Sequence, residues 1–309
     1  MKKGMVFAVW IEEFMNDNFS PSLQVGEVEI FWLDGGRIRL DGGPMFGPVP
    51  KALWSKKVAV DENNCIAIDN SAMLVRTPAA KIIIDSGIGN KMTPKQQENF
   101  NLESPWRLPE ELAGLGLSPE EIDIVIPTHA DFDHAGGLTF RDDEGRIRPT
   151  FPRARHLFQR KEWAVVEKPD RRSATSYWPE NFAALKENDL VTLIDGDFQV
   201  TPEVRVLLTG GHTIGHQAVV IESAGESAVH LGDLLPSQNH LHPLWVIAYD
   251  DYPMEVIAFK ERFLPECAAR KSWILFYHDT EIRAGRAQAG DRGPGIVFSA
   301  TLPKGPQQS

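Results

Sequence analysis

The segment Thr128–Gly137, with the sequence THADFDHAGG, constrains this chain more than any other part of it. It places two imidazoles and two carboxylates within six positions, directly after the apolar run Ile122–Pro127, which is typical of a buried strand. Burying several unpaired polar groups is costly, so the cluster is either a solvated acidic turn or a cation site. Gly136 and Gly137 allow the backbone to turn close beside it.

The same pattern recurs after three later apolar runs. His or Asp follows the predicted strand in each of the segments Thr209–Thr213, His230–Asp233 and Phe276–Asp279. Open α/β sheets build their sites from side chains at the strand ends, so we expect the four segments to meet at one edge. The recurrence favours a cation site over a solvated turn.

Apolar runs alternate with amphipathic stretches along the chain, which predicts a protein of the α/β class. Strands are predicted at Ala72–Thr77, Lys81–Ile84, Ile122–Pro127, Val204–Thr209, Ala218–Glu222, Ala228–Leu231 and Ser272–Phe276. Helices are predicted at Pro109–Leu115, Arg160–Glu167, Glu180–Glu187 and Glu255–Arg270. Val28–Leu40 predicts a hairpin that turns at Asp34-Gly35-Gly36. The segment Asp41–Trp54 mixes Gly and Pro with large apolar residues, which predicts irregular chain packed over another element.

Length and charge narrow the class of protein. A chain of 309 residues can form two domains, but we expect one α/β unit over 1–309 with two similar halves and a frayed tail, Lys304–Ser309. The net charge of −11 argues against nucleic acid as a partner, because phosphate backbones are bound by basic surfaces.

The cellular setting is predicted from three absences. Two cysteines, Cys65 and Cys267, are too few for a disulfide framework, which favours a reducing compartment. The run Met5–Ile11 is followed at once by two glutamates, so we interpret it as an ordinary first segment rather than a signal peptide. No stretch approaches the length of a membrane span. These observations predict a cytoplasmic protein with no membrane partner.

The four segments together resemble the metallo-β-lactamase superfamily, with an HxHxDH-like loop, a GHTxGH segment, a GD segment and a late YHD. Within it, Ile84–Lys91, Gly232–Leu234, Trp245 and Tyr249-Asp250 are similar to the branch of acyl-homoserine lactonases and methyl parathion hydrolase. The resemblance implies a four-layer αβ/βα sandwich of two similar halves, with two metal ions between the sheets.

The resemblance also implies a role for each donor. His129, Asp131 and His212 would bind the first metal ion, Asp133, His134 and His278 the second, and Asp233 would bridge the two. Asp131 departs from the family, which usually has His there, although flavodiiron proteins carry a carboxylate at this position. Zinc is the expected metal, but a hard oxygen donor also makes iron or manganese plausible.

Several nearby residues have two interpretations. Asp85 either orients a ligand histidine or forms a turn, and His216 is expected to be structural or to lie behind the ligands. His230 is expected in the core and His156 at the surface. The charged run Arg160–Arg172 is expected to be a solvated helix face.

The expected pocket wall follows the bridging Asp233. His240 and His242 stand in a loop with Leu241, Leu244, Trp245 and Tyr249, and we predict His240 and Tyr249 as catalytic or substrate-binding residues. Related lactonases place a Tyr three residues after the bridging Asp, where this chain has Pro236. The apolar segment Met45–Trp54 is predicted as a second wall, with core packing as the alternative.

The predicted function is that of a dinuclear metallohydrolase. Two cations lower the pKa of a bridging water, so a hydroxide can attack a small, partly hydrophobic ester or lactone. In the family's scheme Asp133 passes the proton to the leaving group, and with Asp233 it is the predicted catalytic pair. The alternatives are a phosphotriester hydrolase, a diiron enzyme that handles dioxygen or peroxide, and a binding protein with vestigial metals. We expect a small-molecule substrate and consider a homodimer possible.

Overall fold

Two seven-stranded sheets form the centre of the protein in a computed structural model that describes residues 22–290 and 296–304. The first sheet has the order β1-β2-β3-β4-β5-β8-β9. Its strands are β1 Ser22–Val25, β2 Val28–Asp41, β3 Cys65–Arg76, β4 Lys81–Ile84, β5 Ile124–Ile126, β8 Arg155–Gln159 and β9 Val191–Ile194. The second sheet, β10 to β16 in sequence order, has the strands β10 Phe198–Gln199, β11 Val204–Leu208, β12 Gln217–Ser223, β13 Glu226–His230, β14 Trp273–Leu275, β15 Ile282–Ala289 and β16 Ile296–Pro303. A separate small pair consists of β6 Thr139–Arg141 and β7 Ile147–Pro149.

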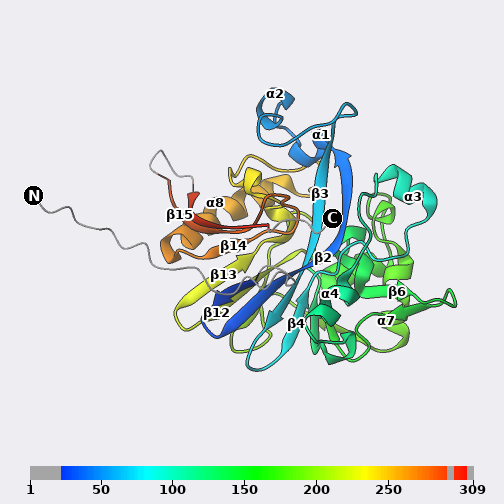
Figure 1. The fold of residues 1–309 in the computed structure, drawn as a ribbon. Helices are drawn as coiled ribbons and strands as arrows, with labels where there is room; N and C mark the ends of the chain where they lie inside the picture. The colour runs from blue at the N-terminus through cyan, green and yellow to red at the C-terminus, as the bar shows by residue number, and fades with distance from the viewer. Residues whose placement is uncertain (1–21, 291–295, 305–309) are drawn as a thin grey trace, which may run out of the picture.

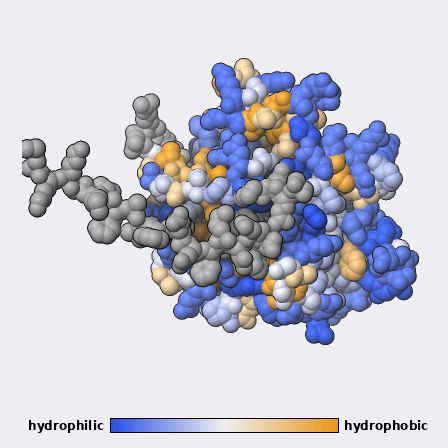
Figure 2. All heavy atoms as spheres, in the orientation of Figure 1, coloured by the Kyte–Doolittle hydropathy of each residue, from blue (hydrophilic) through white to orange (hydrophobic). Residues whose placement is uncertain are grey.

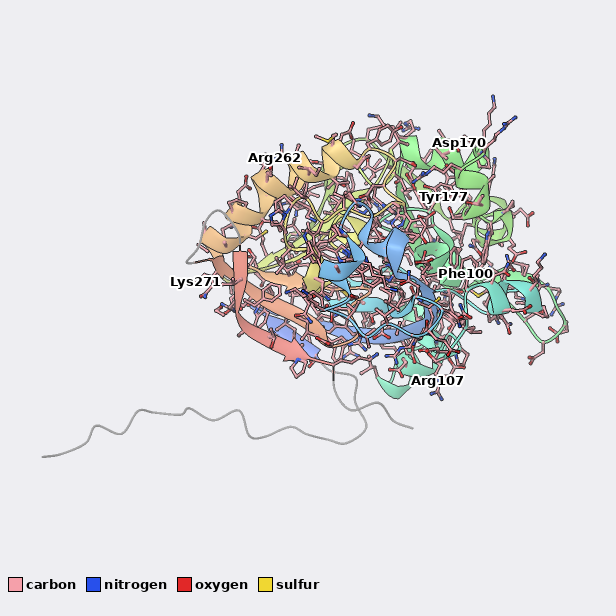
Figure 3. All side chains as sticks on the ribbon, turned by 90° about the horizontal axis from the view of Figure 1, so that it is seen from above. Phe100, Arg107, Asp170, Tyr177, Arg262 and Lys271 are labelled. Atoms are coloured by element: carbon pink, nitrogen blue, oxygen red, sulfur yellow. The ribbon has the colours of Figure 1, made fainter. Side chains whose placement is uncertain are left out.

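The helices surround the two sheets, with α8 on one outer side, α4 and α7 on the other, and α1 and α2 at one edge (Figure 1). They are α1 Gly42–Phe46, α2 Lys51–Trp54, α3 Pro94–Asn99, α4 Leu108–Gly114, α5 Phe132–Ala135, α6 Arg160–Glu167, α7 Ala183–Glu187 and α8 Pro253–Arg270. Viewed from above, α8 with Arg262 lies on one outer side, and the segment with Tyr177 lies on the other (Figure 3). The arrangement is the predicted four-layer sandwich.

Side-chain alternation explains these layers. In β4, Ile82 and Ile84 enter the core between the sheets, while Ile83 joins the core under α4, α6 and α7. In β12, Val219 points between the sheets and Val220 joins a third core under α8. Because neighbouring residues of a strand point to opposite faces, both faces of each sheet are apolar and both must be covered.

The chemistry-bearing segments follow the ends of strands that share an edge of the sandwich. Strands β4, β5, β8 and β9 are parallel, so the segments after β4 and β5 leave at the same edge. In the second sheet β13 is antiparallel to β12 and parallel to β14, which places the ends of β11, β13 and β14 together. The predicted gathering of these segments therefore follows from the topology.

The predicted hairpin at Asp34-Gly35-Gly36 is wrong. Strand β2 runs through this point and pairs with β3 on both sides, with a bulge between Asp34 and Arg37. A Cβ on Gly35 would lie 2.0 Å from the carbonyl oxygen of Asn70, so only glycine fits against β3 here. The glycines therefore form a bulge that bends one long strand. The actual hairpin joins β1 to β2 at Gly26.

Other predicted elements agree closely with the structure. Strand β4 and helix α6 have the predicted bounds, and α8 begins two residues before the predicted start. Helix α7 begins at Ala183, because Pro179–Asn181 forms a separate 3₁₀ turn. The segment Asp41–Trp54 departs from its prediction in part, because it contains the short helices α1 and α2 where irregular chain was expected. It does pack inward as predicted, since the stacked rings of Phe46 and Trp54 are buried with centroids 5.0 Å apart.

Two predictions about exposure are wrong. His156 lies in β8, a strand that the sequence analysis did not predict, and it is buried there with Nδ1 3.1 Å from the carbonyl oxygen of Ala154. Lys304 is not frayed, because it forms an ion pair with the buried Asp69. The rest of the predicted tail and the run Met5–Ile11 lie outside the described residues.

The surface is largely polar, with an apolar patch over α1 and α2 (Figure 2). Leu53 of α2 contributes to it, with 51% of its surface exposed. Within 22–290 and 296–304, no helix combines the length and the apolar character that crossing a membrane requires.

Candidate metal centre

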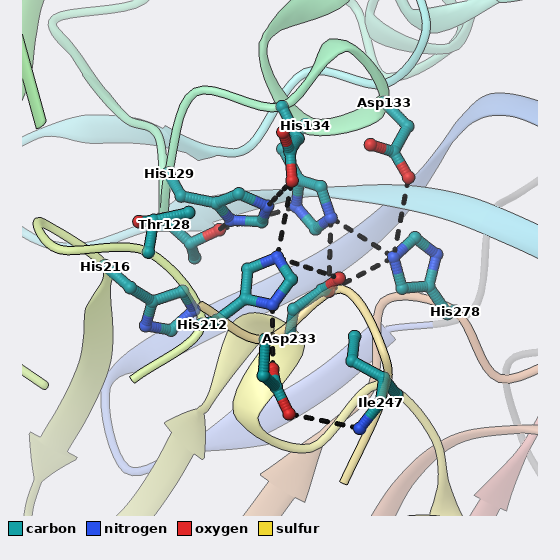
Figure 4. A network of polar contacts seen from close by, with 12 residues as sticks. Thr128, His129, Asp133, His134, His212, His216, Asp233, Ile247 and His278 are labelled. Atoms are coloured by element: carbon teal, nitrogen blue, oxygen red, sulfur yellow. Dashed lines mark hydrogen bonds and ion pairs between the residues drawn. The ribbon is translucent and has the colours of Figure 1, made fainter. Parts of the chain in front are cut away.

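The structure brings all seven predicted metal donors into one cluster (Figure 4). His129 and Asp131 follow β5, Asp133 and His134 lie in α5, His212 follows β11, Asp233 lies in the turn after β13, and His278 follows β14. The histidines are buried, and the four strand ends supply the whole set.

The first half of the cluster is built around Asp131. Its Oδ2 lies 3.3 Å from Nε2 of His129 and 3.3 Å from Nε2 of His212. These three side chains form one group whose donor atoms all lie within 4.8 Å of one another. Asp131 therefore lies beside the two histidines with which the sequence analysis grouped it.

The second half is built around His134 and His278. Their Nε2 atoms each lie 3.2 Å from Oδ1 of Asp233, and Oδ2 of Asp133 lies 3.7 Å from Nε2 of His278. Oδ2 of Asp233 lies 3.6 Å from Nε2 of His212, so Asp233 extends between the two halves. This is the position expected of a bridging residue.

Fixed tautomers aim the histidine lone pairs into the cluster. Nδ1 of His134 donates to Asp85 at 3.0 Å, Nδ1 of His212 donates to Asp250 at 2.9 Å, and Nδ1 of His278 donates to the carbonyl oxygen of Asp69 at 2.7 Å. Each acceptor can only accept, so the Nδ1 atoms carry the protons and the Nε2 lone pairs face inward.

The Thr128 hydroxyl fixes His129 in the same way. It lies 3.0 Å from Oδ2 of Asp85, to which it donates, and 2.9 Å from Nδ1 of His129, from which it accepts. In their neutral form, all four histidines of the cluster therefore present Nε2 as an acceptor.

The arrangement fits divalent cations. Nε2 of His129 and Oδ1 of Asp233 are buried and have no hydrogen-bond partner among the described residues. Nε2 of His134 and Nε2 of His278 lie 3.1 Å apart, which brings two lone pairs together. Converging acceptors without donors are unfavourable unless a cation lies between them, so this donor set suits metal ions.

The electrostatics of the cluster also favour positive charge. Burial lowers the pKa of His134, but the neighbouring Asp233 and Asp85 outweigh it and raise that pKa well above its usual value. Burial likewise opposes the rise in the pKa of His212, which the hydrogen bonds to Asp131 and Asp250 produce. Burial opposes the change at Asp233 as well, but His278 and His134 hold the pKa of this carboxyl well below its usual range. Four carboxylates thus create a field that attracts cations.

The two interpretations of Asp85 are resolved by its contacts. Its Oδ1 accepts from the backbone N–H of Thr128 at 2.6 Å, and its Oδ2 accepts from His134. The residue is buried, with a φ of +55°. Asp85 therefore orients a donor histidine and also forms the turn at the end of β4.

Two further buried histidines, His216 and His230, lie behind the donors. His216 has Nδ1 2.6 Å from the Thr209 hydroxyl, and its ring centroid is 5.4 Å from that of His129. His230 has Nδ1 3.2 Å from the carbonyl oxygen of Leu275 and is a core residue, as expected.

His240 lies in the pocket wall, but its hydrogen bonds do not suit proton transfer. Nε2 is 2.8 Å from the carbonyl oxygen of Met45, and Nδ1 is 2.9 Å from the Ser237 hydroxyl, so both nitrogens are engaged. The ring is buried and stacks on Phe46. The ring therefore packs in the wall, and a part for His240 in catalysis or substrate binding stays a prediction.

A cavity of about 130 Å³ adjoins His278. Its lining includes Met45, Phe46, Ile68 and His240, so the α1 segment forms a wall beside the cluster as predicted. Tyr249, by contrast, is 41% exposed. Burial and then the charge of Asp133 raise the pKa of Tyr249 to about 12, so its hydroxyl stays protonated at neutral pH.

Sequence reasoning missed three supporting residues. Asp250 orients His212, and the Tyr277 hydroxyl donates to the carbonyl oxygen of Asp133 at 2.6 Å while its ring stacks on His134. Glu162 is buried inside the run predicted to be a solvated helix face. Tyr277 and Asp250 stand in the YHD and Tyr249-Asp250 motifs, whereas Glu162 is marked only by its place beside the apolar Trp163.

Fold and site together define a metal-dependent hydrolase with its centre at the strand ends of a four-layer sandwich. The model of the metallo-beta-lactamase superfamily matches residues 67–268, and the chain belongs to this superfamily. The predicted family and enzyme class are therefore confirmed.

Relatives agree with this assignment. An N-acyl homoserine lactonase from Bacillus sp. is 26% identical over 231 residues, which cover 69% of this chain and 82% of the relative. A crystal structure of a probable metal-dependent hydrolase from Staphylococcus aureus has 38% identity and a TM-score of 0.85, and covers 93% of this chain and 100% of its own. A dizinc quorum-quenching lactonase in complex with a product shares the fold, with 21% identity, a TM-score of 0.73 and coverage of 91% and 96%.

Proposed function

We propose that the protein is a dinuclear metal-dependent hydrolase that opens a small, partly hydrophobic lactone or cleaves a similar ester. The observation that carries the proposal is the convergence of seven metal-ligating side chains, in which Nε2 of His129 and Oδ1 of Asp233 are buried acceptors without a hydrogen-bond partner among the described residues. The lactonase names among the relatives support the substrate class.

The proposed metal ligands are those assigned by the resemblance. His129, Asp131 and His212 would hold one ion, Asp133, His134 and His278 the other, and Asp233 both. Zinc is the proposed metal, with iron or manganese as alternatives because Asp131 supplies an oxygen where the family has nitrogen. When bound, such a pair supplies a Lewis acid and a hydroxide at neutral pH.

The chain's own residues would bind the substrate and move the proton. Asp133 is the proposed donor to the leaving oxygen, because its carboxylate borders the cluster and its backbone is held by Tyr277. The cavity wall of Met45 and Phe46 would hold an apolar part of the substrate. Tyr249 is proposed as a hydrogen-bond donor at the rim, because its hydroxyl stays protonated.

Elemental analysis of the purified chain, paired with a panel of a lactone, an aryl ester and a phosphotriester, tests this proposal. We expect about two metal ions per chain, with the lactone or aryl ester as the best substrate, and we expect Asp233→Ala to lose both the metal and the turnover. Full turnover by Asp233→Ala would contradict a bridged pair. Two irons with charge-transfer absorption and no hydrolysis would instead support the diiron redox function.

The proposal extends to the cellular location and the oligomeric state of the enzyme. The free thiols of Cys65 and Cys267 are consistent with a reducing cytoplasm, which we propose as its location. The single unit over 1–309 and the homodimer also stay predictions. Gel filtration with light scattering measures the oligomeric state directly.

A further inference from the structure

Glu162 of α6 is a buried carboxylate that accepts four hydrogen bonds. The residue is 1% exposed. Oε1 accepts from the backbone N–H of Ala130 at 2.9 Å and from the Tyr177 hydroxyl. Oε2 accepts from the Thr213 hydroxyl at 2.8 Å and from the backbone N–H of Gly215 at 3.0 Å.

Three of these donors, Ala130, Thr213 and Gly215, come from the two loops that form the first half of the cluster. Ala130 stands between His129 and Asp131, and Thr213 directly follows His212. One oxygen of Glu162 therefore holds the loop after β5, and the other holds the loop after β11. The loops belong to different sheets, so the carboxylate links the two sheets beside the cluster.

Gly215 allows this close contact. A Cβ on Gly215 would lie 2.4 Å from the Cβ of Glu162, so a side chain here would push the loop away from α6. Tyr177 remains a donor at neutral pH, because burial and the charge of Glu162 raise its pKa well above the usual value. The four donors are thus positioned for a carboxylate.

The second half of the cluster is fixed by other contacts. Asp85 holds His134, the carbonyl oxygen of Asp69 holds His278, and Tyr277 holds the backbone of Asp133. None of these hydrogen bonds involves Glu162. Replacement of Glu162 should therefore weaken metal binding by the first half of the cluster before it affects the second half.

We propose that Glu162 is a positioning residue that sets the spacing of the His129–Asp131 loop and the His212 loop, and so determines affinity for the first metal ion. The inference rests on the proposed metal centre. Residues that orient metal ligands typically change metal affinity 10- to 100-fold when they are replaced. The replacement Glu162→Gln keeps the shape but presents an NH₂ group to donors that need an acceptor.

The test measures the effect of Glu162→Gln on zinc affinity in two variant backgrounds, each of which retains one half of the metal centre. His278→Ala keeps the first half and Asp131→Ala keeps the second, and zinc affinity is measured in each by competition with a chromophoric chelator. We expect zinc affinity to fall about 10- to 100-fold in the His278→Ala background and to change less than about threefold in the Asp131→Ala background. Glu167→Gln, at an exposed position of α6, is the matched control and should change neither.

Equal weakening in both backgrounds, or no change in either, would overturn the inference. If circular dichroism shows that Glu162→Gln does not fold, Tyr177→Phe is used instead, because it removes one of the four donors. It should likewise lower zinc affinity more in the His278→Ala background than in the Asp131→Ala background. A wild-type chain that binds no zinc would instead overturn the proposed metal centre. Failure of the inference and failure of the proposed function are therefore distinguishable.

Discussion

Replacement of Asp85 by Asn tests whether the hydrogen bond between Asp85 and Nδ1 of His134 determines which ring nitrogen of His134 carries the proton. The short bond from the Thr128 N–H to Oδ1 keeps the amide oxygen of the variant at that position. The NH₂ group must then face Nδ1 of His134, which lies 3.0 Å from the present Oδ2. Two donors cannot share this contact, so the ring proton moves to Nε2, the atom that faces Asp233.

The cost of this change sets the expected magnitude. Metal binding requires the Nε2 lone pair of His134, so the variant must leave two buried donors face to face whenever the ion is bound. An unsatisfied buried donor costs about 1–3 kcal/mol, which corresponds to a loss of roughly 5- to 150-fold in affinity. We expect the ion held by Asp133, His134 and His278 to be weakened by this amount.

A second variant, Asp85→Ala, separates the effect on the His134 tautomer from the cost of the backbone conformation at position 85. Asp85 has a φ of +55°, a conformation that Asn tolerates and Ala disfavours by about 1–2 kcal/mol. Asp85→Ala should therefore lower the midpoint of thermal unfolding by more than Asp85→Asn does.

Chelator competition measures both metal affinities, and thermal unfolding of the chelated proteins measures stability. Wild-type affinity at both ions in Asp85→Asn would refute the reasoning.

Three further changes address selectivity, substrate binding and pH. Asp131→His should shift preference towards zinc in a metal competition assay, and unchanged metal content would show that this carboxylate does not set selectivity. His240→Ala should raise KM for hydrophobic substrates more than it lowers kcat, because the ring packs on Phe46 and has no free nitrogen; equal kinetics with the wild type would remove it from the pocket. Burial lowers the pKa of Lys260 to about 7, so the unfolded chain binds more protons between pH 7 and about 10.5, and stability should rise with pH there by up to about 1.4 kcal/mol per pH unit. Urea unfolding with chelator at pH 7 to 9 should show this slope reduced in Lys260→Met, and equal slopes would contradict the burial argument.

The donor set could be predicted from sequence because each donor stands in a short local pattern at a strand end. His212 and His278 are far apart in the chain, yet both follow apolar runs that had to be strands. Parallel and hairpin connections then leave few places where those ends can lie. Local pattern and topology together were sufficient.

Exposure was harder to predict, because it depends on partners distant in sequence. The apolar spacing of Arg160–Glu167 identifies a helix, but the donors that satisfy Glu162 include Thr213, 51 residues away. His156 was misjudged because the strand that contains it was not predicted. At Gly35 a turn signal was present, but pairing with β3 on both sides produced a bulge.

The division of support between Asp85 and Glu162 leads to a combined expectation. Asp85 stands at the end of β4 and acts on His134 directly and on His129 through Thr128. Glu162 stands in α6 and holds the loops of His129 and His212. Among the described residues, the side chains of Asp85 and Glu162 do not hydrogen-bond to each other, but both act on a cluster joined by Asp233, which contacts each half. Effects of distant, independent sites add, and effects on one network do not. Because both residues also act on His129, the double variant Asp85→Asn, Glu162→Gln should lose more affinity for each ion than the two single variants predict. Simple additivity would show that neither His129 nor Asp233 couples the two halves.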